Sequence, residues 1–302
     1  MTAAVAAEGL VRDFGVTRAV NDVSFSVQEG EMFGIVGPDG AGKTTLIRML
    51  AGIMRPTSGR SLLFGNDPRE TPEVMRNEVG YFSQKFSLYG DLTVEENIAF
   101  FAEIHGVRNH AERGEELLEF TRLAPFRRRL AEKLSGGMKQ KLALVCAIIH
   151  KPRIIFLDEP TTGVDPLSRM DFWKILSSLL RTKITIIMST PYMDEAERCG
   201  RIALMNRGEL LAEDSPYNIR RRMGGEILEV VCDRPRVAKR FLESVPGIQD
   251  VQSFGDRLNI SSENAEAART AVSEAMGKAG LGITSMRVIS PSLENVFISL
   301  MA

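Results

Sequence analysis

The chain carries, at residues 37–44, the stretch Gly37-Pro38-Asp39-Gly40-Ala41-Gly42-Lys43-Thr44, which decides the fold. It matches G-x-x-x-x-G-K-[ST], the pattern of a loop whose backbone N–H groups surround phosphate oxygens. An apolar run at residues 32–36 precedes it, as expected of a buried strand, and residues 43–51 have apolar side chains at helical spacing. These flanks argue against a chance glycine-rich turn. They predict a nucleoside triphosphate site, with Lys43 on the β- and γ-phosphates and the Thr44 hydroxyl on Mg²⁺.

Strand-like and helix-like patterns alternate over the first two-thirds of the chain. Further short apolar runs, at residues 154–157, 184–188 and 202–205, are typical of strands buried on both faces. Helical patterns separate them, while residues 19–27 alternate apolar and polar side chains like a half-buried strand. The expected fold class is therefore α/β, with a parallel sheet covered by helices.

Two regions depart from this alternation. The first contains helical patterns and no strand, and Thr93 with Glu96 three residues later forms a capping box, so we expect a helical insertion at residues 93–133. The second follows the order β-α-β-β-α-β from residue 226 to residue 289, which is typical of a small ferredoxin-like α+β domain. The expected domains are residues 1–222 and residues 223–302.

A second motif follows the apolar run at residues 154–157, where Asp158 and Glu159 end the strand. The strand end places the Asp158 carboxylate where it can hold Mg²⁺ through water. Glu159 is the next side chain and points the other way, so it can polarise a water in line with the γ-phosphate. An acidic pair at a strand end is common without such a role. Beside a phosphate-binding loop, however, the pair predicts metal binding and hydrolysis.

A third motif, L-S-G-G-M-K-Q at residues 134–140, opens a helical pattern. Its serine hydroxyl, its free N–H groups and the helix dipole form a second anion site. One nucleotide rarely needs two such helix ends unless the second serves a neighbouring molecule. With this motif the chain resembles the ATP-binding-cassette (ABC) ATPases over residues 5–215, and residues 134–140 are similar to their signature motif.

The resemblance implies a P-loop NTPase cassette with a parallel sheet core, N-terminal antiparallel strands and a helical insertion. In this family two cassettes pack head to tail, and each ATP lies between the glycine-rich loop of one cassette and the signature motif of the other. It therefore implies ATP and Mg²⁺ as cofactors and a second cassette as a homodimer or heterodimer partner. Ser135 and Gly137 would contact the γ-phosphate held by that partner.

The resemblance also assigns roles to single residues. Phe14 lies where the family has an aromatic ring that stacks on adenine, and a core phenylalanine is the alternative. Gln84 matches the glutamine that contacts Mg²⁺ and senses the membrane partner, and it joins Glu159 as a catalytic candidate. Asp165 matches a loop at the dimer interface, although Asp-Pro is also a common helix start. The residues expected on ATP in the first loop are Gly37, Asp39, Gly40, Ala41, Gly42, Lys43, Thr44 and Thr45.

Two positions depart from the family pattern. The family usually has a histidine that contacts the γ-phosphate after the next strand, where this chain has Pro191. Proline has neither a side-chain donor nor an N–H, so it cannot make that contact or orient Glu159. The lost contact predicts turnover lower by about 10²- to 10³-fold, with nucleotide binding retained; an inward-pointing Tyr192 is the alternative. Asp39 stands where asparagine is common and adds a negative charge near the phosphates.

Three features are similar to one branch of the family, the ATPase subunits of ABC-2-type exporters of drugs and antibiotics. They are G-P-D-G at residues 37–40, P-Y-M-D-E-A-E at residues 191–197 and the ferredoxin-like tail. Tandem members have a first cassette without the histidine, and this chain resembles such a cassette standing alone. The expected function is ATP binding and hydrolysis that drive export of a drug, antibiotic or lipid-like substrate. The alternative is a regulatory cassette with little hydrolysis, paired with a competent partner cassette.

Composition argues against several other classes of protein. The 302 residues are 44% hydrophobic and 25% charged, as in globular proteins, and the formal net charge of -1 disfavours a nucleic-acid partner. No apolar run reaches the roughly 20 residues of a membrane-spanning helix. The three cysteines fit no disulfide or zinc pattern. We expect a peripheral subunit on the cytoplasmic face of the membrane, bound to an integral-membrane permease of the ABC-2 type.

Overall fold

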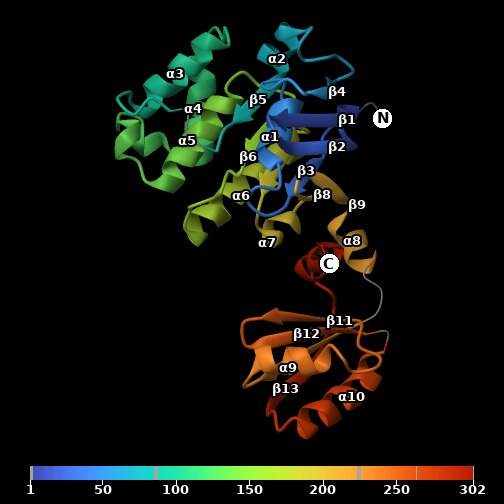
Figure 1. The fold of residues 1–302 in the computed structure, drawn as a ribbon. Coiled ribbons are helices and arrows are strands. Elements are labelled where there is room, and N and C mark those ends of the chain that lie inside the picture. The colour runs from blue at the N-terminus through green and yellow to red at the C-terminus, as the bar shows by residue number, and fades with distance from the viewer. Residues whose placement is uncertain (1–2, 85–87, 223–225, 263, 302) are drawn as a thin grey trace. The chain divides into compact units, whose positions relative to one another are not determined.

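The chain folds into two compact units, which are described separately (Figure 1). This computed structural model describes residues 3–84, 88–222, 226–262 and 264–301. The first unit runs through Glu213 and the second begins at Asp214, which is earlier than the division expected after residue 222. Helix α8 (Pro216–Arg222) belongs to the second unit because it packs against helix α11 (Leu293–Met301). Residues 223–225, where the second domain was expected to begin, lie outside the described residues.

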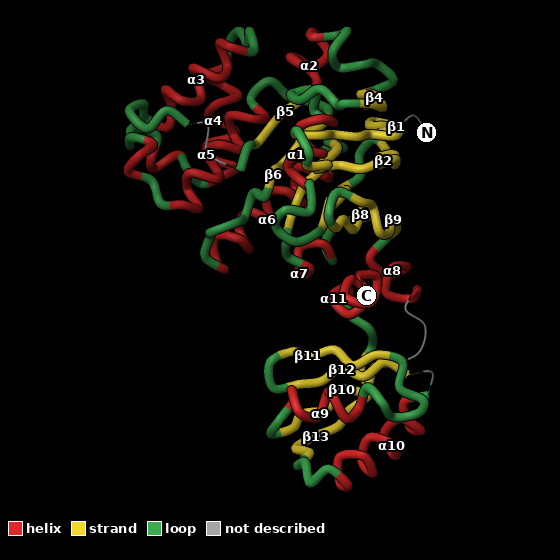
Figure 2. Tube along the Cα trace, in the orientation of Figure 1, coloured by secondary structure: helices red, strands yellow, loops and turns green. Residues whose placement is uncertain are grey.

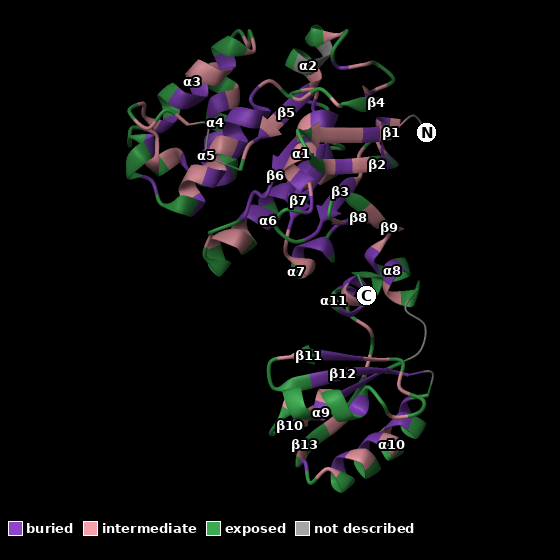
Figure 3. Cartoon of the chain, in the orientation of Figure 1, coloured by how far each residue is buried: buried purple, intermediate pink, exposed green. Residues whose placement is uncertain are grey.

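A six-stranded sheet in the order β5-β6-β7-β3-β8-β9 forms the centre of the first unit. The pairs from β5 through β8 are all parallel. Every residue of β3, β6 and β7 is buried, which explains their nearly unbroken apolar sequences (Figure 3). The predicted parallel core is confirmed. The strands are β3 (Met32–Val36), β5 (Val79–Phe82), β6 (Ile154–Asp158), β7 (Thr185–Thr190), β8 (Arg201–Asn206) and β9 (Glu209–Asp214).

A three-stranded antiparallel sheet in the order β2-β1-β4 confirms the antiparallel strands implied near the N-terminus. Its strands are β1 (Ala3–Phe14), β2 (Thr17–Gln28) and β4 (Ser58–Leu63). Leu10 and Val23 of this sheet share one buried apolar cluster with Ile35 of β3 and Leu46 of helix α1 (Lys43–Leu50). The three-stranded antiparallel sheet and α1 therefore pack together with β3, the strand that leads into the glycine-rich loop.

The helical insertion expected at residues 93–133 contains α3 (Val94–Ile104) and α4 (His110–Thr121), and α3 packs against α4 and α5 (Gly136–Ile148) (Figure 2). The capping box is confirmed, because the Thr93 N–H donates to Glu96 Oε2 at 2.7 Å and the Glu96 N–H donates to Thr93 Oγ1 at 3.2 Å. Other helices of this unit are α2 (Pro72–Glu78), α6 (Pro166–Arg181) and α7 (Met193–Ala196), with 3₁₀ turns at Ala124–Phe126 and Ala131–Lys133. Within the described residues, no helix is both long and apolar enough to span a membrane.

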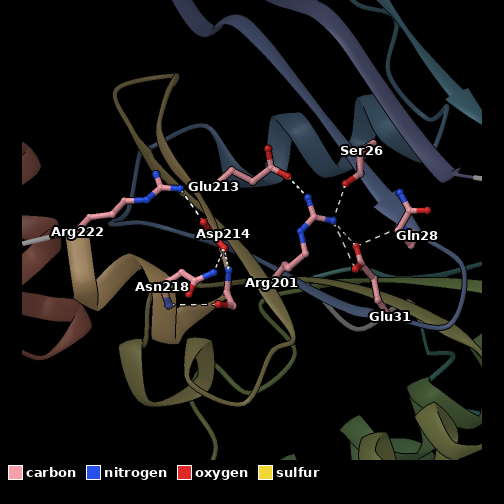
Figure 4. A network of polar contacts seen from close by, with 9 residues as sticks. Ser26, Gln28, Glu31, Arg201, Glu213, Asp214, Asn218 and Arg222 are labelled. Carbon is pink, nitrogen blue, oxygen red and sulfur yellow. Dashed lines mark hydrogen bonds and ion pairs between the residues drawn. The ribbon is translucent and has the colours of Figure 1, made fainter. Parts of the chain in front are cut away.

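Arg201, at the start of β8, ties the edge of the parallel sheet to β2 and β9 (Figure 4). Its Nη1 donates to Glu31 Oε1 at 3.0 Å and to the Ser26 carbonyl oxygen at 3.1 Å, and its Nη2 bonds Glu213. A guanidinium has several donors in a fixed plane, so one side chain can hold acceptors from different strands at once. This contact fixes β9 and the turn before β3.

The second unit has an antiparallel sheet in the order β11-β12-β10-β13, packed against α9 and α10 over its own apolar core. The predicted ferredoxin-like order β-α-β-β-α-β is confirmed. Before α8, Asp214 accepts hydrogen bonds from the Ser215 N–H at 2.7 Å and the Asn218 side chain at 2.8 Å (Figure 4). The elements are β10 (Glu226–Cys232), α9 (Pro235–Leu242), β11 (Asp250–Phe254), β12 (Arg257–Ser262), α10 (Ala265–Lys278) and β13 (Ile283–Ile289).

Candidate active site

The glycine-rich loop joins β3 to α1, and close contacts with backbone require glycine at two of its positions. A Cβ on Gly37 would lie 2.2 Å from the Met205 carbonyl oxygen, and one on Gly42 would lie 2.3 Å from that of Ala19. Gly42 has φ of 98° and is the N-cap of α1, with no side-chain cap. No cap from this residue competes with an anion for the first N–H groups of the helix. Asp39 and Gly40 are exposed, Ala41 is buried, and Thr45 is half-buried.

Lys43 begins α1 and forms a buried ion pair with Glu159, the residue after β6. Lys43 Nζ lies 3.0 Å from Glu159 Oε1 and donates to the Pro38 carbonyl oxygen at 3.0 Å. The two side chains are only 3% and 7% exposed. Each charge of such a buried pair offsets part of the cost of burying the other. The structure thus brings the expected phosphate-binding lysine and the expected catalytic carboxylate into direct contact.

Thr44 and Asp158 lie side by side at the expected metal position. The hydroxyls of Thr44 and Ser189 donate to Asp158 Oδ1 at 2.9 Å and 2.8 Å. Asp158 is fully buried, and its Oδ2 has no hydrogen-bond partner among the residues that the structure describes. Burial raises the pKa of Asp158, although the hydrogen bonds from Ser189 and Thr44 oppose the shift. An unpaired buried carboxylate oxygen next to a hydroxyl is a hard oxygen donor set, so these residues fit Mg²⁺.

Three neighbours fix Glu159 in addition to Lys43. Glu159 Oε2 accepts hydrogen bonds from Gln84 Nε2 at 3.0 Å and from the Thr162 hydroxyl at 3.3 Å. The Glu159 N–H donates to Ser189 Oγ at 3.0 Å. The φ of Glu159 is 48°, a left-handed conformation that costs a non-glycine residue on the order of 1–3 kcal/mol and persists only where its surroundings hold it. Gln84 and Glu159, the two catalytic candidates, are therefore in contact.

Ser189 joins this site although none of the motifs contains it. Its hydroxyl donates to Asp158 and accepts from the Glu159 N–H, so it bridges the two residues at the end of β6. The signal in the sequence is a hydroxyl residue directly after the apolar run at residues 184–188. Glu195 of α7 is a second residue to which the sequence motifs give no role. It is fully buried and lies in the segment at residues 191–197, which is similar to one branch of the family.

Phe14, the adenine-stacking candidate, ends β1 and is 45% exposed. The guanidinium carbon of Arg12 lies 4.6 Å from its ring centre. The exposure argues against the alternative of a core phenylalanine and leaves the ring accessible to a flat partner.

Ser135 and Asp165, the candidates for contact with a second cassette, each cap a helix. Ser135 accepts from the Met138 N–H at 3.3 Å at the start of α5, and Asp165 accepts from the Ser168 N–H at 3.0 Å at the start of α6. The hydrogen bonds from Ser168 lower the pKa of Asp165. A Cβ on Gly137 would lie 2.5 Å from Ser168 Oγ, so the starts of the two helices are packed against each other at Gly137.

Pro191 follows β7 directly, and the next residue points to α6. The guanidinium carbon of Arg169 lies 4.7 Å from the ring centre of Tyr192, and the Tyr192 N–H donates to Thr190 Oγ1 at 3.1 Å. These contacts tie Tyr192 to α6 and β7, so they give no support to an inward-pointing Tyr192.

Comparison with protein families matches residues 20–162 to "ABC transporter" and residues 215–301 to "ATP-binding protein DrrA1-3-like, C-terminal domain". The chain is 43% identical over 218 residues to the probable multidrug ABC transporter ATP-binding protein YbhF of Escherichia coli (strain K12), in a match that covers 72% of this chain but only 38% of that protein. It is 36% identical to the Nod factor export ATP-binding protein I of Rhizobium sp. (strain N33), over 97% of this chain and 95% of that protein. It is 32% identical to the daunorubicin resistance ATP-binding protein DrrA2 of Streptomyces coeruleorubidus, over 98% and 94%.

The fold also resembles solved structures. One, described as the structure of an ATP binding subunit of an ABC transporter, matches with a TM-score of 0.66 and 30% sequence identity. The match covers 72% of this chain and 92% of that chain.

Proposed function

Because the chain belongs to the ATP-binding proteins of ABC transporters, we propose that it binds ATP with Mg²⁺ and hydrolyses it to drive a membrane exporter. The observation that carries this proposal is the cluster of buried Lys43, Glu159 and Asp158 with half-buried Thr44 at one end of the parallel sheet. Relatives named for multidrug transport, Nod factor export and daunorubicin resistance favour a drug, antibiotic or lipid-like substrate.

Lys43 is the residue proposed to hold the β- and γ-phosphates. Its ammonium is occupied by Glu159 and the Pro38 carbonyl oxygen. A triphosphate offers more negative charge than one carboxylate, so it would draw the ammonium away from Glu159. The released carboxylate can then accept a proton from the attacking water. The other loop residues proposed to contact ATP are Gly37, Asp39, Gly40, Ala41, Gly42, Thr44 and Thr45.

Thr44 and Asp158 would hold Mg²⁺, with Gln84 close by through its contact with Glu159. When bound, the ion neutralises charge on the phosphate oxygens. Asp158 offers its unpaired Oδ2, while the Ser189 and Thr44 hydroxyls keep Oδ1 in place. Gln84 orients Glu159 from the opposite side to Lys43, because the two bind different oxygens of its carboxylate.

A second cassette, identical or different, would complete the site. Ser135 and Gly137 would contact the γ-phosphate bound by the partner, and Asp165 would lie at the interface between the two. Two features of this chain support the assignment: Ser135 is the N-cap of the buried helix α5, and the Asp165 carboxylate lies at the start of α6. Phe14 would stack on adenine with its exposed ring.

The proposed membrane partner is an integral permease of the ABC-2 type, which would hold this chain at the cytoplasmic face. The relatives that match almost the whole chain are named as export or resistance ATP-binding proteins, and that supports the assignment. The net charge of -1 gives no support to a nucleic-acid partner.

Pro191 favours a second candidate function, a regulatory cassette that binds ATP but hydrolyses little of it. The decisive experiment mixes this chain with candidate partner cassettes and compares Glu159→Gln here with the matching change in the partner. If Glu159→Gln here lowers the rate of phosphate release, this chain hydrolyses ATP. If only the partner's change stops release, this chain is the regulatory half.

A further inference from the structure

Glu195 is a fully buried carboxylate that gathers hydrogen-bond donors from several segments. Its Oε1 accepts from the Thr161 hydroxyl at 2.5 Å, from Arg169 Nη2 at 2.9 Å and, more weakly, from Trp173 Nε1 at 3.5 Å. Its Oε2 accepts from the Thr190 hydroxyl at 2.7 Å. Only a carboxylate offers this many acceptor positions without adding a donor of its own.

The donors come from three segments that border the proposed site. Thr161 lies two residues after Glu159, in the loop that follows β6. Thr190 is the last residue of β7, directly before Pro191. Arg169 and Trp173 belong to α6, the helix capped by Asp165. The Glu195 side chain therefore joins the loop after β6 to the end of β7 and to α6.

The loop after β6 needs such an anchor. Glu159 has left-handed backbone geometry, which persists only when its surroundings hold it in place. Thr161 is 2% exposed and gives its hydroxyl to Glu195, whereas the neighbouring Thr162 gives its hydroxyl to Glu159 Oε2 at 3.3 Å. Fixing Thr161 thus fixes the donor that orients the carboxylate of Glu159.

We propose that Glu195 is a positioning residue for ATP hydrolysis, which holds Glu159 in its reactive orientation through Thr161. The inference rests on the proposed ATPase function and extends it to a residue outside the nucleotide-binding motifs. Pro191 offers no donor to orient Glu159. Once the nucleotide draws Lys43 away, the orientation depends on Gln84, Thr162, Ser189 and the anchored loop.

The test compares Glu195→Gln with Asp194→Asn in the full-length chain. Asp194 is the matched control, because it pairs with the same Arg169 at 3.1 Å but is 67% exposed. Glu195→Gln replaces an acceptor oxygen with an NH₂ group that faces existing donors. We expect its kcat to fall by about 10- to 100-fold, as for a small misplacement of a catalytic group. The KM for ATP and the affinity for a fluorescent ATP analogue should stay within about twofold, and Asp194→Asn should keep the wild-type kcat.

Thr161→Val is the second variant, since it removes the hydroxyl at similar volume and leaves the pair of Arg169 with Glu195. We expect the same selective fall in kcat, and no further fall when Thr161→Val and Glu195→Gln are combined, because residues that act as one unit are not additive. A wild-type kcat in Thr161→Val, or losses that multiply in the double variant, would overturn the inference.

Failure of the proposed hydrolysis and failure of the proposed role of Glu195 give different results. If the wild-type chain binds the fluorescent analogue but releases no phosphate from ATP, the proposed hydrolysis fails and this inference fails with it. If the wild-type chain turns over ATP and Glu195→Gln has the same kcat with only a lower melting temperature, Glu195 is purely structural and this inference alone is wrong.

Discussion

Lys43 and Glu159 neutralise each other inside the proposed nucleotide site, with 3.0 Å between Nζ and Oε1. The pair joins the residue proposed to hold the phosphates to the residue proposed to activate water. A triphosphate that takes the lysine would therefore free the glutamate in the same event. In the proposed function, binding of substrate and readiness of the base would be coupled through one ion pair.

Removal of one member of this pair should destabilise the first unit. Lys43→Met leaves the Glu159 carboxylate buried without its cation, and we expect the free energy of unfolding to fall by about 3 kcal/mol. The double variant Lys43→Met with Glu159→Gln should lose clearly less. Urea unfolding followed by fluorescence of Trp173, the one tryptophan of the chain, measures this loss in the first unit. A loss in the double variant equal to the sum of the losses in Lys43→Met and Glu159→Gln alone would show that the pair carries no coupling.

Ser189→Ala should impair turnover and stability together. The substitution removes the acceptor of the Glu159 N–H and a donor to Asp158, so we expect kcat to fall by about tenfold and stability by about 1–2 kcal/mol. Ser177→Ala is the control, because the Ser177 hydroxyl donates only to a carbonyl oxygen within α6. Phosphate-release assays measure the change in kcat, and urea unfolding measures the change in stability. A Ser189→Ala variant with the kcat of Ser177→Ala contradicts the proposed bridge.

Pro191→His should raise turnover if the missing histidine limits hydrolysis. A histidine side chain restores a donor after β7, and we expect kcat to rise by about tenfold or more. Pro191→Ala is the control for loss of the proline ring alone. A Pro191→His variant no faster than Pro191→Ala would show that this position does not limit the reaction.

His150 should make the first unit sensitive to acid. Its ring stacks on the ring of His105, with 3.8 Å between the two ring centres. Burial, and to a smaller extent the neighbouring His105, lowers the pKa of His150 from 6.5 to about 4. Its contribution to stability is complete above pH 6.5, because both the folded and the unfolded chain are then neutral at this residue. As the pH falls towards 4, only the unfolded chain takes up the proton, so stability falls by on the order of 2–3 kcal/mol.

Urea unfolding at several pH values between 6.5 and 4 measures this dependence, with His150→Gln as the comparison. The amide can still donate to the Val79 carbonyl oxygen, to which His150 Nε2 lies at 3.0 Å. We expect the variant to lose less stability than the wild-type chain over this range. The same pH dependence in both proteins would exclude His150 as its source.

The sequence predicts those parts of the fold that depend on local pattern. The apolar runs of β3 and β6 are buried strands, and the Thr93–Glu96 capping box starts α3, because burial and capping leave their marks within a few residues. The role of Ser189 depends on long-range pairing. It reaches Asp158 because β6 lies next to β7 with these two residues in register. A single sequence does not specify which strands are neighbours.

The contacts of Glu195 cannot be predicted from the sequence for the same reason. Its donors lie in the loop after β6, at the end of β7 and in α6, and only the packed fold brings these segments to one carboxylate. The compact units divide before α8 and not after residue 222, because α8 packs on α11 although it follows directly after β9 in the sequence.

The most direct test of the central claim is the rate of phosphate release from Mg²⁺-ATP by the purified full-length chain and its Glu159→Gln variant, at matched nucleotide occupancy. The account predicts measurable release by the wild-type chain and a rate lower by about 100-fold or more in the variant, with nucleotide affinity retained. Equal rates in the two proteins, or no release by the wild-type chain at saturating ATP, would contradict it.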